Sequence, residues 1–319
     1  MILYQWRGPV RNFGDELNGL IWPCLLPNYF DDDPAARFLG IGSILDERHD
    51  PAAIKWVAGS GYGGYEASVA LDATWRIHWV RGPRTAAVLG LPLSLGMGDP
   101  ASLLPLTGLS PRVKPRDERC DVGFDVGFMP HFESNSRGAW AEAASAAGVT
   151  LIDPSGDPRA ILDAIGACRV LISEALHGVI VADALRIPWI AIQPLMPIHR
   201  PKWADWADAL DLDLDPRPLR PSTALERAWR SPVSRFHAGR EMLEQRAHPL
   251  RRLGRAGHIE RAAGALRAAA AADPMLSRDS ALDRSQTRMM TAIEAIRRDP
   301  ASSSGAVQAS IFIRPGLST

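Results

Sequence analysis

Short apolar runs alternate with helical stretches along the first two thirds of the chain. In the first part, each run ends in a turn rich in glycine, proline or ionisable residues. A strand is predicted at 2–6, and further strands at the beginning of each of the segments 35–45, 54–64, 75–91 and 93–105. Two short helices are also predicted, one after Gly42 and one after the Gly-Pro turn inside 75–91. This alternation is typical of a parallel sheet with helices on its faces.

A second cycle of strands and helices begins after residues 106–119, which are rich in proline and charge and predict a linker. Strands are predicted within 120–132 and at 149–153, 169–173 and 188–192; helices are predicted at 136–148, 157–168 and 175–186. Asp157 is the expected N-cap of its helix, with Pro158 at the first helical position.

The amino-acid composition changes again near residue 236, where alanine, arginine and leucine dominate. The pattern therefore predicts a first lobe at 1–115, a second lobe at 116–235 and a helical tail at 236–319, with a disordered end at 301–319. We expect an α/β protein of two doubly wound lobes in tandem. In such sheets, ligands bind beyond the carboxyl ends of the strands.

Composition narrows the class of protein. The 319 residues are 46% hydrophobic and carry a formal net charge of zero, which argues against a general electrostatic nucleic-acid binder. Three cysteines stand far apart without a CxxC pair: Cys24, Cys120 and Cys168. Their spacing argues against a disulfide scaffold or zinc site and predicts buried packing in a reducing cytosol.

We see no signal peptide, and the longest apolar stretch is interrupted by charges, so a cytoplasmic protein is expected.

Several loops that follow predicted strands are rich in glycine, including "RNFGDELN" (11–18), "GIGS", "GSGYGG" and "SEALHG". In a parallel sheet these loops share one edge, where glycine lets backbone N–H groups approach a ligand and helix N-termini favour anions. An anionic ligand is therefore predicted. The candidate contacts from these loops are Gly14, Gly42, Ser43 and Gly61.

Three residues are candidates for proton transfer. His177 opens a predicted helix directly after a strand, where it could act as a base or donate to a phosphate; a core histidine is the alternative. His131 follows the first strand of the second lobe, and its alternative is an ordinary loop histidine. Asp15 could transfer a proton or cap the following helix, and Asp99 has the same two readings.

Cationic groups for the anion are also present near these loops. Arg81 and Arg84 flank a Gly-Pro turn and suit bidentate phosphate or carboxylate binding, although a surface pair is the alternative. Arg200 and Lys202 lie in "IHRPKW" at the end of the second lobe. No metal-ligand spacing is visible, so no metal is expected.

Taken in order, these loops resemble the polysaccharide pyruvyl transferase family, in particular the exopolysaccharide type that acts in succinoglycan biosynthesis. The resemblance rests on "NFGDELN", "FLGIGSIL", "WVAGSGYGG", "VRGPRTAAVLG", "GDPASLLP", "MPHFES" and "LISEALHGVIVADALRIPWIAI", over about residues 2–200. It implies two Rossmann-like lobes similar to GT-B glycosyltransferases. It also implies phosphoenolpyruvate as donor, a hexose of a lipid-linked oligosaccharide as acceptor, a cyclic pyruvate ketal as product, and no cofactor.

In the family a Ser-Arg-Leu-His pattern precedes the last helix, and its Arg and His are expected to hold the donor. Here Glu174-Ala175-Leu176-His177 matches it, so the His is kept and Ala175 replaces the Arg. Two alternatives stay open: a GT-B glycosyltransferase that uses a nucleotide-sugar, and a non-catalytic relative.

The tail raises a separate question. Arginines recur among leucine and alanine at partly helical spacing: Arg251, Arg252, Arg255, Arg261 and Arg267. A basic helix of this kind could rest on the inner membrane near a lipid-linked acceptor. The favoured alternative is a helix that packs against the first lobe.

Overall fold

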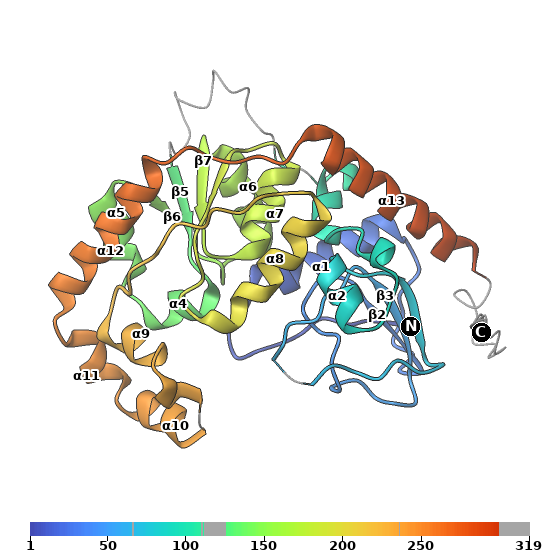
Figure 1. Cartoon of the computed structure of the whole chain (residues 1–319), viewed down its shortest axis with the longest axis horizontal. Coiled ribbons are helices and arrows are strands. Elements are labelled where there is room, and N and C mark those ends of the chain that lie inside the picture. The colour runs from blue at the N-terminus through green and yellow to red at the C-terminus, as the bar shows by residue number, and fades with distance from the viewer. Residues whose placement is uncertain (66, 110, 112–125, 236, 300–319) are drawn as a thin grey trace, which may run out of the picture.

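Two parallel sheets form the framework of the protein (Figure 1). The structure is a computed structural model, and it describes residues 1–65, 67–109, 111, 126–235 and 237–299. In this part of the chain each sheet has four strands, and all neighbouring strands within the sheets run parallel. The predicted mixed α/β class with parallel sheets is confirmed.

The first sheet keeps its strands in chain order. They are β1 (Ile2–Leu3), β2 (Ala36–Leu39), β3 (Ile54–Ala58) and β4 (Trp75–Trp79). Helix α1 (Phe13–Leu25) makes the first crossover, and α2 (Pro83–Val88) follows β4. The helix predicted after Gly42 is wrong: residues 43–45 are a bend and irregular backbone that lead to a bridge at Asp46, and Gly42 itself has a φ of +136°. The order does not reverse among these strands, so doubly wound order is not confirmed in this sheet.

The strand predicted at the start of 93–105 is also wrong. This segment forms two 3₁₀ helices, η1 (Leu93–Leu95) and η2 (Pro100–Thr107). It touches the sheet edge by one parallel bridge, between Val80 and Gly96. Pro92 and Pro100 lack the N–H that a longer ladder would require.

The second sheet has the order β6-β5-β7-β8, so its connections reverse direction between β5 and β7. Its strands are β5 (Val126–Met129), β6 (Thr150–Leu151), β7 (Val170–Ser173) and β8 (Trp189–Ala191). The helices between them are α4 (Phe132–Arg137), α5 (Trp140–Ala147), α6 (Pro158–Ala167) and α7 (Leu176–Ala184). Asp157 caps α6 as predicted, accepting from the N–H groups of Arg159 and Ala160. The reversal sets the loops after β5 and β7 next to one another.

The lobes share one apolar core. Its largest cluster contains Leu17 of α1, Leu103 and Leu104 of η2, and Val179 and Ile180 of α7. Helix α7 packs against η2 and against α1. The first turn of α7 is therefore held against both lobes.

The rest of the chain wraps around both lobes (Figure 1). After β8 come η3 (Pro197–His199), α8 (Arg200–Ala209), α9 (Ala224–Trp229), η4 (Pro232–Arg235), α10 (His237–Gln245), α11 (Ala247–Arg252), α12 (Arg255–Ala270) and α13 (Asp279–Arg298). Helix α12 lies on α5 of the second lobe. The arginines of the predicted basic helix lie in α11 and α12, so the expectation that this helix packs against the first lobe is wrong. Helix α13 packs on the first lobe instead: Ser285 Oγ donates to the Met97 carbonyl at 2.6 Å, and Gln286 Nε2 donates to the Ser102 carbonyl at 2.7 Å.

Some sequence predictions fall outside the described residues: the lobe boundary at 115, Cys120, most of the linker at 106–119 and the end at 301–319. Of the other cysteines, Cys168 is buried as predicted. Cys24 is exposed, so its predicted burial is wrong; it lies on the outer side of α1 next to an exposed Pro23. Within the described part of the chain, every helix is too short or too polar to cross a membrane.

Candidate functional site

A cavity of about 900 Å³ lies at the carboxyl ends of the second-lobe strands. The first lobe contributes the start of α1 and the loop after β2, and the second lobe contributes the loops after β5 and β7. Residues 196–199 and Lys202 close one side. The cavity therefore occupies the strand-order reversal, where open α/β sheets place their ligands.

His177 lies in the first turn of α7, as the sequence predicted, and lines the cavity. Its Nε2 is 3.5 Å from Oδ2 of the fully buried Asp99, which belongs to the other lobe. Its Nδ1 faces Gly14: a Cβ built on that glycine would lie 1.9 Å from it. Gly14 is thus needed because the imidazole occupies the space of a side chain. Asp99 also caps η2, because its side chain accepts from the Ala101 N–H, so the predicted cap is confirmed; its role in proton transfer stays a prediction.

Asp15 lines the cavity from the first turn of α1. The helix begins after Asn12, which is the N-cap, so Asp15 is not the cap that the sequence allowed. Asn12 Nδ2 donates to Asp15 Oδ2 at 2.6 Å. Burial raises the pKa of Asp15, while the Asn12 hydrogen bond and the charges of His177 and Lys202 oppose that rise. The net rise favours the protonated form of this carboxyl group more than in an exposed aspartate.

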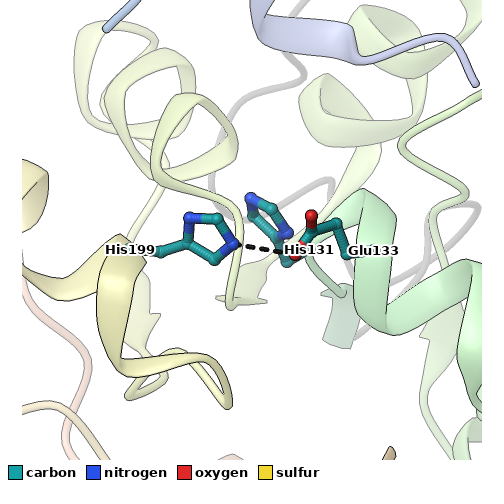
Figure 2. A group of neighbouring side chains, drawn as sticks. All are labelled: His131, Glu133 and His199. Atoms are coloured by element: carbon teal, nitrogen blue, oxygen red, sulfur yellow. Dashed lines mark hydrogen bonds and ion pairs between the residues drawn. The ribbon is translucent and has the colours of Figure 1, made fainter. Parts of the chain in front are cut away.

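His131 begins the α4 segment and stacks on His199, with ring centroids 4.1 Å apart (Figure 2). Its side chain is buried, and Nδ1 has no hydrogen-bond partner in the described structure. Burial lowers the pKa of His131 well below 6.5, and the charges of His199 and Lys202 lower it further. The ring is therefore neutral at pH 7 and can accept a proton.

His199 is held by two further side chains. Its Nε2 lies 2.9 Å from Oε2 of Glu133, and its Nδ1 lies 3.1 Å from the Tyr65 hydroxyl. Because a carboxylate can only accept, Nε2 carries the proton and Nδ1 accepts from Tyr65. Burial alone would raise the pKa of Glu133, but the His199 hydrogen bond and neighbouring cations lower it to about 2. Figure 2 shows the His199 ring turned towards Glu133, with His131 beside it.

Glu174 fixes the loop that carries His131. Its Oε2 accepts from the backbone N–H of His131 at 3.0 Å, and its Oε1 accepts from Ser134 Oγ at 3.0 Å and from the Leu195 N–H at 2.8 Å. Glu174 is fully buried, and that burial raises its pKa. The side chain thus ties the end of β7 to the loops after β5 and β8.

His131, Glu133 and His199 are also the group, within the described residues, whose donor atoms lie close enough to hold a metal ion, all within 4.8 Å. Both nitrogens of His199 already have partners. Lys202 and Arg137 add positive charge beside the group, and this charge disfavours the binding of a metal cation. These contacts favour a proton-transfer cluster, and the expected absence of a metal stays a prediction.

The predicted donor contacts divide into two sets. Gly14, Gly42, Ser43, His177 and Lys202 line the cavity. Four others do not: Arg81, Arg84, Arg200 and Gly61. Arg81 is buried and its Nε bonds to Asp205 at 3.0 Å, with Gly61 packed on its guanidinium; Arg84 is exposed and bonds to Asp208 at 2.7 Å. Their role as donor contacts is untested.

Other cations line the cavity: Arg48, Arg137, Arg230 and Arg240. Arg48 is paired with Asp46, whereas Arg137 contacts Glu133 at 3.4 Å and lies over the Trp229 ring. Ala175 lines the wall between His177 and the loop after β5. Sequence analysis missed Tyr65, Glu133 and Arg137. Glu133 stands two residues after His131 in "MPHFES", so that motif held a signal for it.

The chain is similar to known proteins of one family. A family model for polysaccharide pyruvyl transferase matches residues 70–194, which include His131 and His177. The chain is 33% identical over 318 residues to the succinoglycan biosynthesis protein ExoV of Rhizobium meliloti (strain 1021), covering 93% of this chain and 98% of that protein. No solved structure matches the chain. The extent and identity of the match to ExoV show that the chain belongs to the polysaccharide pyruvyl transferase family.

Proposed function

We propose that the protein transfers the pyruvyl group of phosphoenolpyruvate to a hexose of a lipid-linked exopolysaccharide oligosaccharide, forming a cyclic ketal. The observation that carries the proposal is the meeting of Asp15, His131, His177 and Lys202 in one cavity. We also propose that the two parallel sheets form Rossmann-like lobes in a GT-B-like arrangement. The order β6-β5-β7-β8 in the second sheet supports this reading.

The reaction requires two proton movements. A first sugar hydroxyl adds to C2 of phosphoenolpyruvate, and C3 gains a proton to become a methyl group. The C2–O bond to phosphate then breaks, and a second hydroxyl closes the ketal at C2. One hydroxyl proton balances the new C–H bond, and the other leaves with phosphate. The site must therefore supply an acid, a base and cations for the donor.

The residues of the cavity match these needs. Asp15, whose pKa burial raises, is the proposed acid towards C3. His131, neutral because burial lowers its pKa, is the proposed base for a hydroxyl. His177 and Lys202 are the proposed contacts of the phosphate, near the N-terminus of α7. Arg137 is proposed to take the donor carboxylate in place of the arginine that Ala175 replaces.

The test is a calorimetric titration of the purified protein with phosphoenolpyruvate, with UDP-glucose and inorganic phosphate as comparators. His177→Ala should abolish phosphoenolpyruvate binding, whereas the exposed His248→Ala, outside the cavity, should preserve it. Selective binding of UDP-glucose would favour a glycosyltransferase instead. If neither ligand binds, with or without a saccharide acceptor, a non-catalytic relative is the better account.

A further inference from the structure

A second cavity, of about 930 Å³, lies between the segment after β8 and helix α12. We call it the arginine groove. Five arginines line it: Arg217, Arg220, Arg227, Arg230 and Arg261. Its described lining contains no Asp or Glu. Several guanidinium groups in one lining favour the binding of an anion.

Most of these charges are not neutralised by the protein. Arg217 pairs with Asp215 at 3.1 Å, but the two side chains are 42% and 74% exposed, so solvent weakens the pair. The other four arginines form no ion pair with any residue that the structure describes. His258 also lines the groove, close to these arginines. Burial lowers the pKa of His258, and the charges of Arg261 and Arg227 lower it further, whereas its hydrogen bond with the Pro221 backbone raises it.

The groove also has an apolar side. Ala265 and Ala268 of α12 line it, together with Ala272 just after the helix and with Pro218 and Pro221. Helix α12 is fixed in place by its packing on α5. A ligand in this groove would meet guanidinium groups on one side and methyl and methylene groups on the other. That combination suits a phosphate ester of an apolar alcohol better than a free sugar.

The arginine groove adjoins the donor cavity, because Arg230 lines both. We infer that the groove binds the diphosphate group of the acceptor, while the saccharide that this group carries extends into the donor cavity. Guanidinium forks on two separate segments, 217–230 and α12, match two adjacent phosphates. The link to the acceptor rests on the proposed function; the anion site rests only on the groove.

The experiment titrates the full chain with geranyl diphosphate, a diphosphate ester with a short apolar chain, and with inorganic pyrophosphate. In Arg227→Gln/Arg261→Gln, affinity for both should fall at least about tenfold, because two charge-assisted contacts are lost. Phosphoenolpyruvate binding should not change. Arg252→Gln, an exposed arginine outside both cavities, is the matched control and should bind like wild type. Thermal unfolding checks that the double variant is folded.

Geranyl diphosphate should bind more tightly than inorganic pyrophosphate, because the alanine and proline side of the groove contacts its chain. Unchanged affinity for both in the double variant would overturn the anion site. Tighter binding of UDP than of geranyl diphosphate would overturn the assignment to the acceptor and point to a nucleotide. If geranyl diphosphate binding depends on the arginines while phosphoenolpyruvate does not bind at all, the groove stands and the proposed function fails.

Discussion

The two sides of the donor cavity differ in what they contribute. The first lobe supplies the small residues Gly14, Gly42 and Ser43, several aromatic and apolar side chains, and one carboxyl group at Asp15. The second lobe supplies the titratable groups His131, Glu133 and His177, with His199 and Lys202 from the segment that follows β8. The difference follows strand order. The first sheet runs in chain order, whereas the second reverses between β5 and β7 and so brings two histidine-bearing loops together.

Burial by itself does not distinguish the two sides. His78, at the end region of β4 in the first lobe, stacks on Trp56 with ring centroids 5.4 Å apart, and burial lowers its pKa to about 4. It does not line the donor cavity. His131 has a lowered pKa for the same main reason but faces the cavity. A histidine with a shifted pKa therefore marks a candidate site only where the fold also provides space for a ligand.

The largest expected effect comes from His131→Gln. It should lower kcat by about 10²- to 10⁴-fold, because the proposed base is lost while the amide keeps part of the volume. Steady-state release of phosphate from phosphoenolpyruvate with a saccharide acceptor measures it. His78→Gln is the matched control on the other side and should keep wild-type turnover. Equal turnover in His131→Gln and wild type would remove His131 from the chemistry.

Next in size is the effect of the arginines that join the lobes. Arg81→Ala should lower the free energy of unfolding by about 3–5 kcal/mol, because it leaves Asp205 buried without its partner. Arg84→Ala removes an exposed pair with Asp208 and should cost only about 0–1 kcal/mol. Urea unfolding of both variants measures the difference. Similar losses would show that the Arg81 pair does not hold α8 against the first lobe.

The smallest effect is a pH dependence of stability. His78 and His131 have lower pKa values in the folded than in the unfolded state, so the folded state binds fewer protons. The free energy of unfolding should therefore fall as pH drops below 6.5, and the contribution of His78 should level off below about 4.

His78→Gln and His131→Gln should each flatten this slope, which urea unfolding at a series of pH values measures. Only His131→Gln should also alter turnover. A slope that neither variant changes would mean that other groups, such as His49 or His199, dominate the acid response.

Much of the framework could be predicted from sequence. Apolar runs placed all eight described strands and the helices α6 and α7. Central strands such as β3 and β7 are buried and read as continuous apolar runs, and the N-cap of α6 at Asp157 is a local signal. The strand expected after residue 92 failed because its prolines limit pairing to one bridge. The helix expected after Gly42 failed because the short apolar stretch that follows is buried as irregular backbone, which an apolar pattern does not distinguish from a helix.

The candidate site was predicted only in part. His131, His177 and Asp15 followed strands or opened helices, so their place at one edge was predictable, and all three line the cavity. Glu133 and Tyr65 were missed because their roles depend on His199, which lies 66 and 134 residues away from them in the chain. Arg81 and Arg84 look alike in sequence, yet one is buried with Asp205 and the other is exposed.

By itself, the sequence determined the α/β class, the glycine-rich loops and the residue types available for proton transfer, because these depend on local periodicity and on neighbours along the chain. Only the tertiary structure decided which charges are paired, which histidine stacks on another and where two cavities share an arginine. Those relations join residues from both lobes and the tail. They are set by strand order and by the packing of α7, α8 and α12, which no local pattern encodes.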